Sequence, residues 1–159
     1  MKIFLKNFMI YCVGFTLYQT MEGLFKMFFS HHAESFTMGI LGGLSILLIG
    51  GLNRFKKYQP PIPLQMIIGG LIITLLEFVT GCIFNLWLLP MLGKPIIWDY
   101  SNIPGNILGQ ICPQFTIIWM FLSIIAIFVD DYLRWKVYGD PKPHYKWWFG
   151  CKKVCFVKD

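Results

Sequence analysis

The chain has 159 residues, of which 56% are hydrophobic and only 14% are charged. This is too apolar for a soluble domain of that size, so the excess apolar surface is expected to face lipid. The net charge of +6 makes nucleic acid a conceivable partner, but the positions of the basic residues have another explanation, and no nucleic-acid binding is expected.

Four apolar stretches are long enough to cross a membrane as helices, since a hydrocarbon core of about 30 Å needs about 20 residues. They cover roughly residues 5–25, 36–52, 64–89 and 106–128. The first follows two lysines, as a signal peptide does, but no small-x-small cleavage site follows it, and we expect it to be retained. The sequence therefore predicts an all-α fold, a bundle of four transmembrane helices in residues 1–138, followed by a basic aromatic tail at 139–159.

The basic residues predict the orientation, because cytoplasmic loops of membrane proteins are enriched in lysine and arginine. With the N-terminus inside, twelve of them fall on the cytoplasmic side and two, Lys26 and Lys94, on the other. Both termini are thus expected in the cytoplasm, with the tail residues 144–149 forming an interfacial anchor on anionic headgroups. This distribution accounts for the net charge without nucleic acid.

The third stretch carries a polar face. Gly70, Thr74, Glu77, Gly81 and Asn85 follow one another at steps of four, three, four and four residues, which places them on one side of a helix. A carboxylate within a membrane is costly and normally faces a bundle interior or a watery cavity, where it marks a functional site. A structural glutamate that locks helix packing is the alternative for Glu77.

Other polar residues are expected near the outer end of the same bundle. Glu22 lies late in the first stretch, and Asn106, Gln110 and Gln114 open the fourth at four-residue spacing, with a kink predicted at Pro113. The loop between the third and fourth stretches serves either as a structural cap or as the rim of a ligand site. The predicted pocket consists of Glu22, Glu77, Asn85, Trp98, Asp99, Tyr100, Ser101, Asn106 and Gln110.

Two further segments are given structural roles. Gly39 and Gly43 have the small-xxx-small spacing that lets another helix approach closely, and packing within the same chain is favoured over a dimer interface. The loop over residues 53–63 contains three prolines and is interpreted as a stiff connector.

Motifs for catalysis and metal binding are missing. The sequence contains no G-x-x-x-x-G-K-[ST] phosphate loop, no G-x-S-x-G and no H-E-x-x-H. His31 and His32 with Glu34 are adjacent ligands without a third at metal spacing, so no metal site and no cofactor is predicted. The five cysteines are expected to be reduced.

Two blocks of the sequence resemble a known family. They are T-x-x-E-x-x-x-G, at Thr74–Gly81, and W-D-Y-S followed by N-x-x-G-Q-I-C, at Trp98–Ser101 and Asn106–Cys112. Both resemble the ABC-transporter type IV family of small membrane proteins from Firmicutes. The resemblance implies a permease-like component in the bacterial plasma membrane, and since the chain has no ATPase motif, a separate ATPase subunit.

The leading hypothesis is a transporter component with an outward-facing polar pocket for a small polar or cationic solute, completed by a homo-oligomer or by a partner subunit. The alternative is a non-transporting assembly, immunity or regulatory protein whose polar cluster is structural. A membrane enzyme acting on lipid or cell-wall intermediates is a third hypothesis, although no motif points to a reaction.

Overall fold

The structure is a computed structural model that describes residues 2–29, 36–54, 59–94 and 96–148. These residues form helices and contain no strand beyond an isolated bridge between Ile107 and Ile111. The helices in chain order are α1 (Lys2–Phe29), α2 (Phe36–Gly50), the 3-10 turn η1 (Leu52–Arg54), α3 (Ile62–Gly81), the π-helical segment η2 (Cys82–Leu88), α4 (Leu89–Met91) and α5 (Pro113–Lys136). The all-α prediction is confirmed for this part of the chain.

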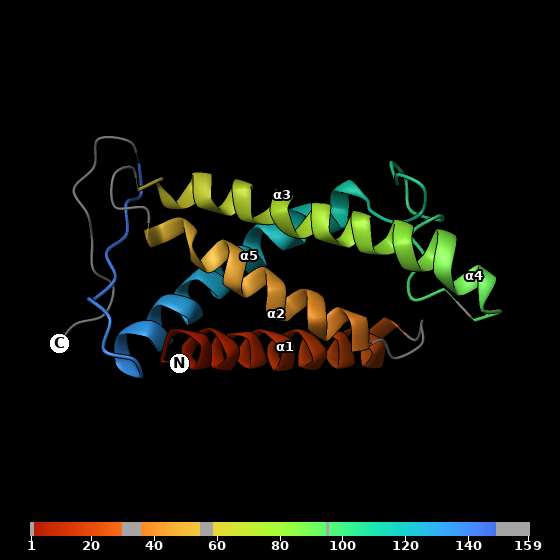
Figure 1. Cartoon of the computed structure of the whole chain (residues 1–159). Coiled ribbons are helices and arrows are strands. Elements are labelled where there is room, and N and C mark those ends of the chain that lie inside the picture. Colours follow the sequence, from red (N-terminus) through yellow and green to blue (C-terminus); the bar gives the residue numbers. More distant parts are fainter. Residues whose placement is uncertain (1, 30–35, 55–58, 95, 149–159) are drawn as a thin grey trace.

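Four long helices run up and down, with α1 against α2 and α3 against α5, and α2 joins the two pairs by packing against α3 and α5 (Figure 1). Three helical stretches among the described residues are long and apolar enough to cross a membrane: residues 36–54, 62–91 and 113–136. Helix α1 has 28 residues but is not one of these three. Four crossings with both ends inside therefore remain a prediction.

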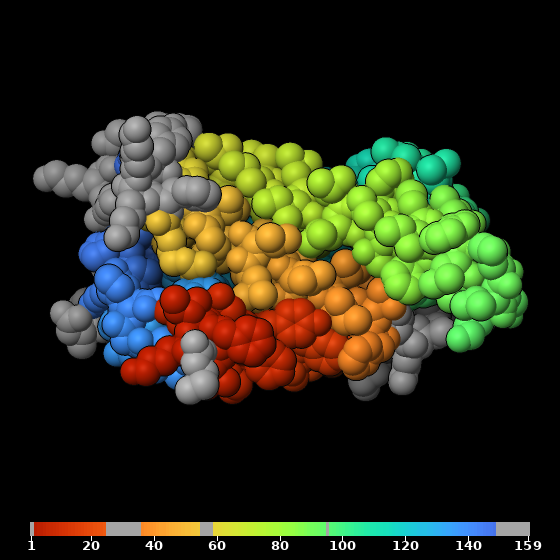
Figure 2. All heavy atoms as spheres, viewed as in Figure 1, coloured from red at the N-terminus to blue at the C-terminus, as the bar shows by residue number. Residues whose placement is uncertain are grey.

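Large apolar side chains cover the outside of the bundle. On α3 they recur every four residues, at Ile67, Leu71, Leu75 and Val79, and each is at least 42% exposed. Figure 2 shows α1, α2 and α3 side by side on one such face of the molecule. Apolar side chains exposed over whole helix faces would contact water in a soluble protein, which is unfavourable. We therefore expect these faces to contact lipid.

Glycines allow α1 and α2 to pack closely. A Cβ atom added to Gly42 would lie 2.3 Å from the Tyr18 Cβ and 2.8 Å from the Gly14 carbonyl oxygen, so no larger residue fits there. Gly39 and Gly43 lie against the rings of α1 aromatics in the same way. The prediction that this glycine face packs within the chain is confirmed.

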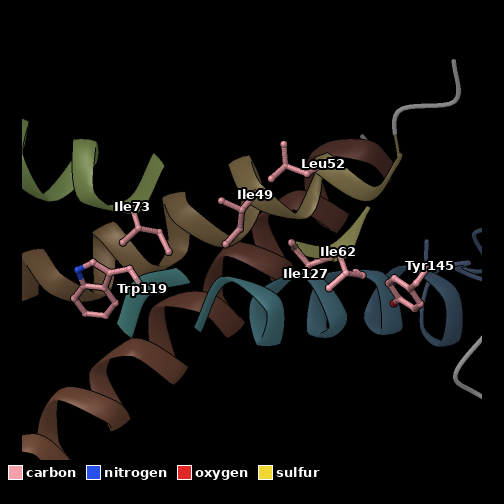
Figure 3. Close-up of a cluster of buried hydrophobic side chains, with 7 residues drawn as sticks. All are labelled: Ile49, Leu52, Ile62, Ile73, Trp119, Ile127 and Tyr145. Atoms are coloured by element: carbon pink, nitrogen blue, oxygen red, sulfur yellow. The ribbon is translucent and has the colours of Figure 1, made fainter. Parts of the chain in front are cut away.

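An apolar cluster fills the space among α2, α3 and α5. Its buried members are Ile49, Leu52, Ile62, Ile73, Trp119, Ile127 and Tyr145 (Figure 3). Tyr145 comes from the segment after α5, and its ring packs edge-on to Phe128 with centroids 4.8 Å apart. The cluster therefore connects the middle of the bundle with the segment that follows α5.

The last long helix differs from its predicted bounds. It begins at Pro113, not at Asn106, because Cys112 is extended (φ −150°, ψ 156°) and Pro113 takes the first helical position, where a missing N–H costs nothing. The predicted kink at Pro113 is therefore wrong. Beyond the apolar span, the helix runs on to Lys136 and carries Asp130, Arg134 and Lys136 in its last turns.

The segment after α5 folds back across the end of the bundle. Gly139 adopts a positive φ of 71°, and the next residue, Asp140, donates from its N–H to the Arg134 carbonyl over 2.9 Å. The Ile62 N–H at the start of α3 then donates to the Lys146 carbonyl over 2.7 Å. Tyr145 is only 4% exposed, so it belongs to the core and not to an interfacial anchor; residues 149–159 of the predicted tail lie outside the described residues.

Candidate functional site

Glu77 lies on the buried face of α3, with 2% of its surface exposed. Each carboxylate oxygen accepts one hydrogen bond: Oε1 from the Tyr100 hydroxyl over 2.8 Å, and Oε2 from the Trp119 indole Nε1 over 2.9 Å. Thr74, one turn before Glu77, bonds instead to Thr116 across the helix pair. The carboxylate is thus held by donors from α5 and from the loop that precedes α5.

Asn85 fastens the same loop to the π-helical segment. Its Nδ2 donates to the Trp98 carbonyl over 2.9 Å and to Gln110 Oε1 over 2.8 Å, and its Oδ1 accepts from the Ile97 N–H over 2.7 Å. The π-helical geometry shows in the Leu89 N–H, which bonds to the Phe84 carbonyl five residues earlier. This wide turn immediately precedes Pro90, which has no N–H to continue a regular helix, and wide turns of this kind are frequent at functional sites.

The loop inserts its aromatic side chains between α3 and α5. Trp98 and Tyr100 are 3% and 9% exposed, and the Trp98 indole donates to the Gln110 carbonyl over 3.1 Å. The Tyr100 ring stacks on Phe115 with centroids 4.7 Å apart. Burial and the adjacent Glu77 carboxylate raise the pKa of Tyr100, which keeps its hydroxyl protonated as a donor.

Gly81 makes room for the loop at this point. A Cβ atom there would lie 2.4 Å from Gln110 Oε1, so only glycine lets the Gln110 amide reach Asn85. We call the converging group the Glu77 cluster; it comprises Glu77, Asn85, Trp98, Tyr100, Gln110 and Trp119. Five of these were predicted site residues, whereas Trp119 was not, because an aromatic residue in an apolar helix looks like ordinary core.

Three predicted residues instead shape the loop itself. Asp99 accepts from the Ser101 N–H over 2.8 Å, and Asn106 bonds to the Ser101 and Ile103 carbonyls and to the Gly109 N–H. Asp99 and Ser101 are exposed. These three therefore hold the loop in shape and are not brought against Glu77.

Glu22 lies on α1, the helix that reaches the Glu77 cluster through Tyr18. It lies one turn after Tyr18, whose ring packs 5.5 Å from the Trp119 ring. The structure thus places α1 beside the cluster through Tyr18.

A second buried polar group lies at the opposite end of the bundle and was not predicted. Asp130 has no exposed surface; Arg54 contacts one of its oxygens, and Arg134 Nε reaches both at 2.9 and 3.0 Å. Arg134 also donates to Asn7 on α1, and Asn53 links Asp131 to α3. We call this the Asp130 network; it joins α1, η1, α3 and α5 through Asn7, Asn53, Arg54, Gln65, Asp130, Asp131 and Arg134.

The sequence held one signal for this network. Asp130 and Arg134 are four residues apart, the spacing of an ion pair along a helix. The burial of these charges was not predicted, because no local pattern connects Arg54 with Asp130, 76 residues later. The loop over residues 53–63, predicted to be only a connector, therefore contributes Asn53 and Arg54 to buried contacts.

No cluster of potential metal ligands occurs among the described residues, so the arrangement offers buried carboxylates, amides and aromatic donors in place of a metal centre. An all-helical bundle with exposed apolar faces, three helices fit to cross a membrane and buried charges gathered in two clusters defines an integral membrane protein. The chain belongs to the family described as "Putative ABC-transporter type IV", whose model matches residues 3–157. No curated protein and no solved structure matches it significantly.

Proposed function

We propose that this chain is the membrane component of a transport system in the bacterial plasma membrane, with four spans, both ends in the cytoplasm, and the ATPase on a separate subunit. The family description and the apolar helices support membership of an ABC-type system. Four helices are few for a complete pathway, which favours a homo-oligomer or a partner membrane subunit.

The buried carboxylate of Glu77 is the observation that carries the proposal for solute binding. It lies on a helix that is apolar on its other faces. Burying an acidic group within a membrane is energetically unfavourable, and acidic residues found there commonly have a function. A carboxylate there attracts a small cationic or polar solute, with the Asn85 and Gln110 amides as neutral ligands beside it. The site opens to the outside in this proposal, since the loop over residues 96–112 covers it on the outer face.

Access requires the loop to move, because Glu77 is only 2% exposed and the Tyr100 hydroxyl and the Trp119 indole lie against its two oxygens in this state. Displacing the Tyr100 side chain frees Oε1 while Trp119 continues to hold Oε2. The state described here is thus an occluded one, in which Tyr100 takes the position that a solute or a water molecule would fill. Asp99, Ser101 and Asn106 act in this scheme by keeping the loop folded as it moves.

The contacts that Glu77 and Asn85 make within the protein also fit an alternative function. Since every Glu77 oxygen and the Asn85 amide have protein partners, the cluster also fits a non-transporting assembly, immunity or regulatory protein in which it only locks the helices. The two functions differ in one respect: a transporter must expose Glu77 to something from outside, and a lock must not.

Dicyclohexylcarbodiimide, an apolar reagent for protonated carboxyl groups, distinguishes them. We expect the reagent to modify Glu77 in membranes, faster in Tyr100→Phe, and more slowly when Na⁺, K⁺, Mg²⁺ or spermidine occupies the site. Peptide mass mapping locates the adduct. The Glu77→Gln variant shows how much of the reaction occurs at other carboxyl groups. If Glu77 resists the reagent in wild type and in Tyr100→Phe alike, or if none of these four cations protects it, the structural alternative replaces the transport proposal.

A further inference from the structure

Two lysines lie against one tryptophan at the end of α5. The Lys136 Nζ is 3.8 Å from the centre of the Trp135 ring, and the Lys142 Nζ, from the returning segment, is 5.4 Å from the same point. The two ammonium groups are therefore held near each other by a shared aromatic ring. The fold brings them together, since Gly139 turns the chain back between them.

Nearby acidic side chains are engaged by other cations. Asp140 pairs with Lys6, and Asp130 and Asp131 take part in the ion pairs of the Asp130 network. Such a cationic pair beside an interfacial tryptophan complements a phosphate group at the level of lipid headgroups.

An apolar stripe on α5 leads to this cationic pair. Ile117, Phe121, Ile125 and Tyr132 are at least half exposed, and their spacings of four, four and seven residues place them on one face of the helix. Lys136 follows Tyr132 by four residues and continues the same face. An apolar strip that ends in two cations has the layout of a phospholipid with a negative headgroup.

We propose that Trp135, Lys136 and Lys142 form a binding site for the phosphodiester headgroup of an anionic phospholipid, whose acyl chains lie along the α5 stripe. The proposal rests on the membrane location of α5 and is independent of any role of Glu77. It places the lipid at the end of the bundle where α1 starts and α5 ends (Figure 1). The predicted headgroup contact thus lies on α5 and its returning segment, whereas the sequence alone placed it at residues 144–149.

Native mass spectrometry of the full chain, titrated with phosphatidylglycerol or with phosphatidylcholine of the same acyl chains, tests the proposal. Wild type is expected to prefer phosphatidylglycerol, and Lys136→Gln with Lys142→Gln is expected to lower that affinity about thirtyfold, since each lysine near an anionic surface contributes about 1 kcal/mol. The matched control, Lys2→Gln with Lys94→Gln, removes the same charge elsewhere and should retain the preference. A thermal melt of each variant in detergent shows that it is folded.

Three outcomes would overturn the proposal. In the first, the control variant loses as much affinity as the site variant, so the attraction is diffuse. In the second, both lipids bind equally, so the headgroup charge does not contribute to binding. In the third, millimolar inorganic phosphate displaces the lipid, so the site binds free phosphate. The carbodiimide reaction at Glu77 should be unchanged in the lysine variants, and phosphatidylglycerol binding unchanged in Glu77→Gln. Each proposal can therefore fail without the other.

Discussion

Replacing Glu77 by leucine removes the acceptor for two buried donors. The Tyr100 hydroxyl and the Trp119 indole N–H are left without the partners they have at 2.8 and 2.9 Å. An unpaired buried donor costs about 1–3 kcal/mol, whereas side-chain hydrogen bonds in helical membrane proteins average nearer to about 0.6 kcal/mol. We therefore expect Glu77→Leu to lower the free energy of unfolding by about 1–4 kcal/mol.

Glutamine at the same position should be nearly neutral. Its Oε1 can accept from Trp119, which is a donor only, and its Nε2 can donate to the Tyr100 hydroxyl, which accepts as well as donates. Both hydrogen bonds survive, and the expected loss is below about 1 kcal/mol, because only the charge assistance disappears.

Unfolding of the purified chain by dodecyl sulfate in mild detergent, followed by tryptophan fluorescence, measures both changes. Val79→Leu, an apolar exchange on the exposed face of the same helix, is the matched control and should match wild type. The reasoning is refuted if the leucine variant at Glu77 is as stable as wild type. It is also refuted if the glutamine and leucine variants lose equal stability, since the hydrogen-bond pattern would then not be what matters.

Three further predictions concern topology, helix packing and the second cluster. In a background without native cysteines, Gly93→Cys should react with an impermeant thiol reagent in intact cells and Gln59→Cys should not; equal labelling contradicts four spans with both ends inside. Gly42→Val should lower the unfolding midpoint strongly, since even a Cβ would lie 2.3 Å from the Tyr18 Cβ, whereas a midpoint like that of wild type would rule out the close α1–α2 contact. Asp130→Leu leaves the buried Arg134 without its ion-pair partner and should cost about 3–5 kcal/mol in the same dodecyl sulfate titration, while a loss below about 1 kcal/mol would mean that Arg134 is solvated.

Periodicity predicted the helices well because helix formation is local. The polar face of α3 is visible in the sequence, since residues three and four apart share a side, and Glu77 and Asn85 are both buried in the structure. The start of α5 was misjudged for the same reason. Asn106, Gln110 and Gln114 have helical spacing by chance, while Leu108 and Gly109 adopt positive φ angles that no regular helix contains.

Contacts between distant segments were harder to predict. The sequence placed Tyr100 and Gln110 near the end of the bundle. It did not predict which of the nearby polar residues would form hydrogen bonds with each other. The Asp130 network was missed altogether, because a charge at a helix end is ordinarily solvated, whereas Arg54 and the end of α2 at Gly50 pack against this one. A resemblance between sequence blocks identified the family correctly, and its model matches residues 3–157.

The wide turn at Cys82–Leu88 determines where this part of the chain can change in length. A π-helical turn accommodates about one residue more than an α-helical one, so losing a residue there would restore a regular helix and change the directions of the side chains within the segment. Asn85 would then no longer face the loop that it holds. The turn at Gly93 is different, since its φ is positive and a Cβ atom added there would meet no other part of the protein within 4 Å. Insertions and deletions among relatives should therefore fall at Gly93 and spare the seven residues before Leu89.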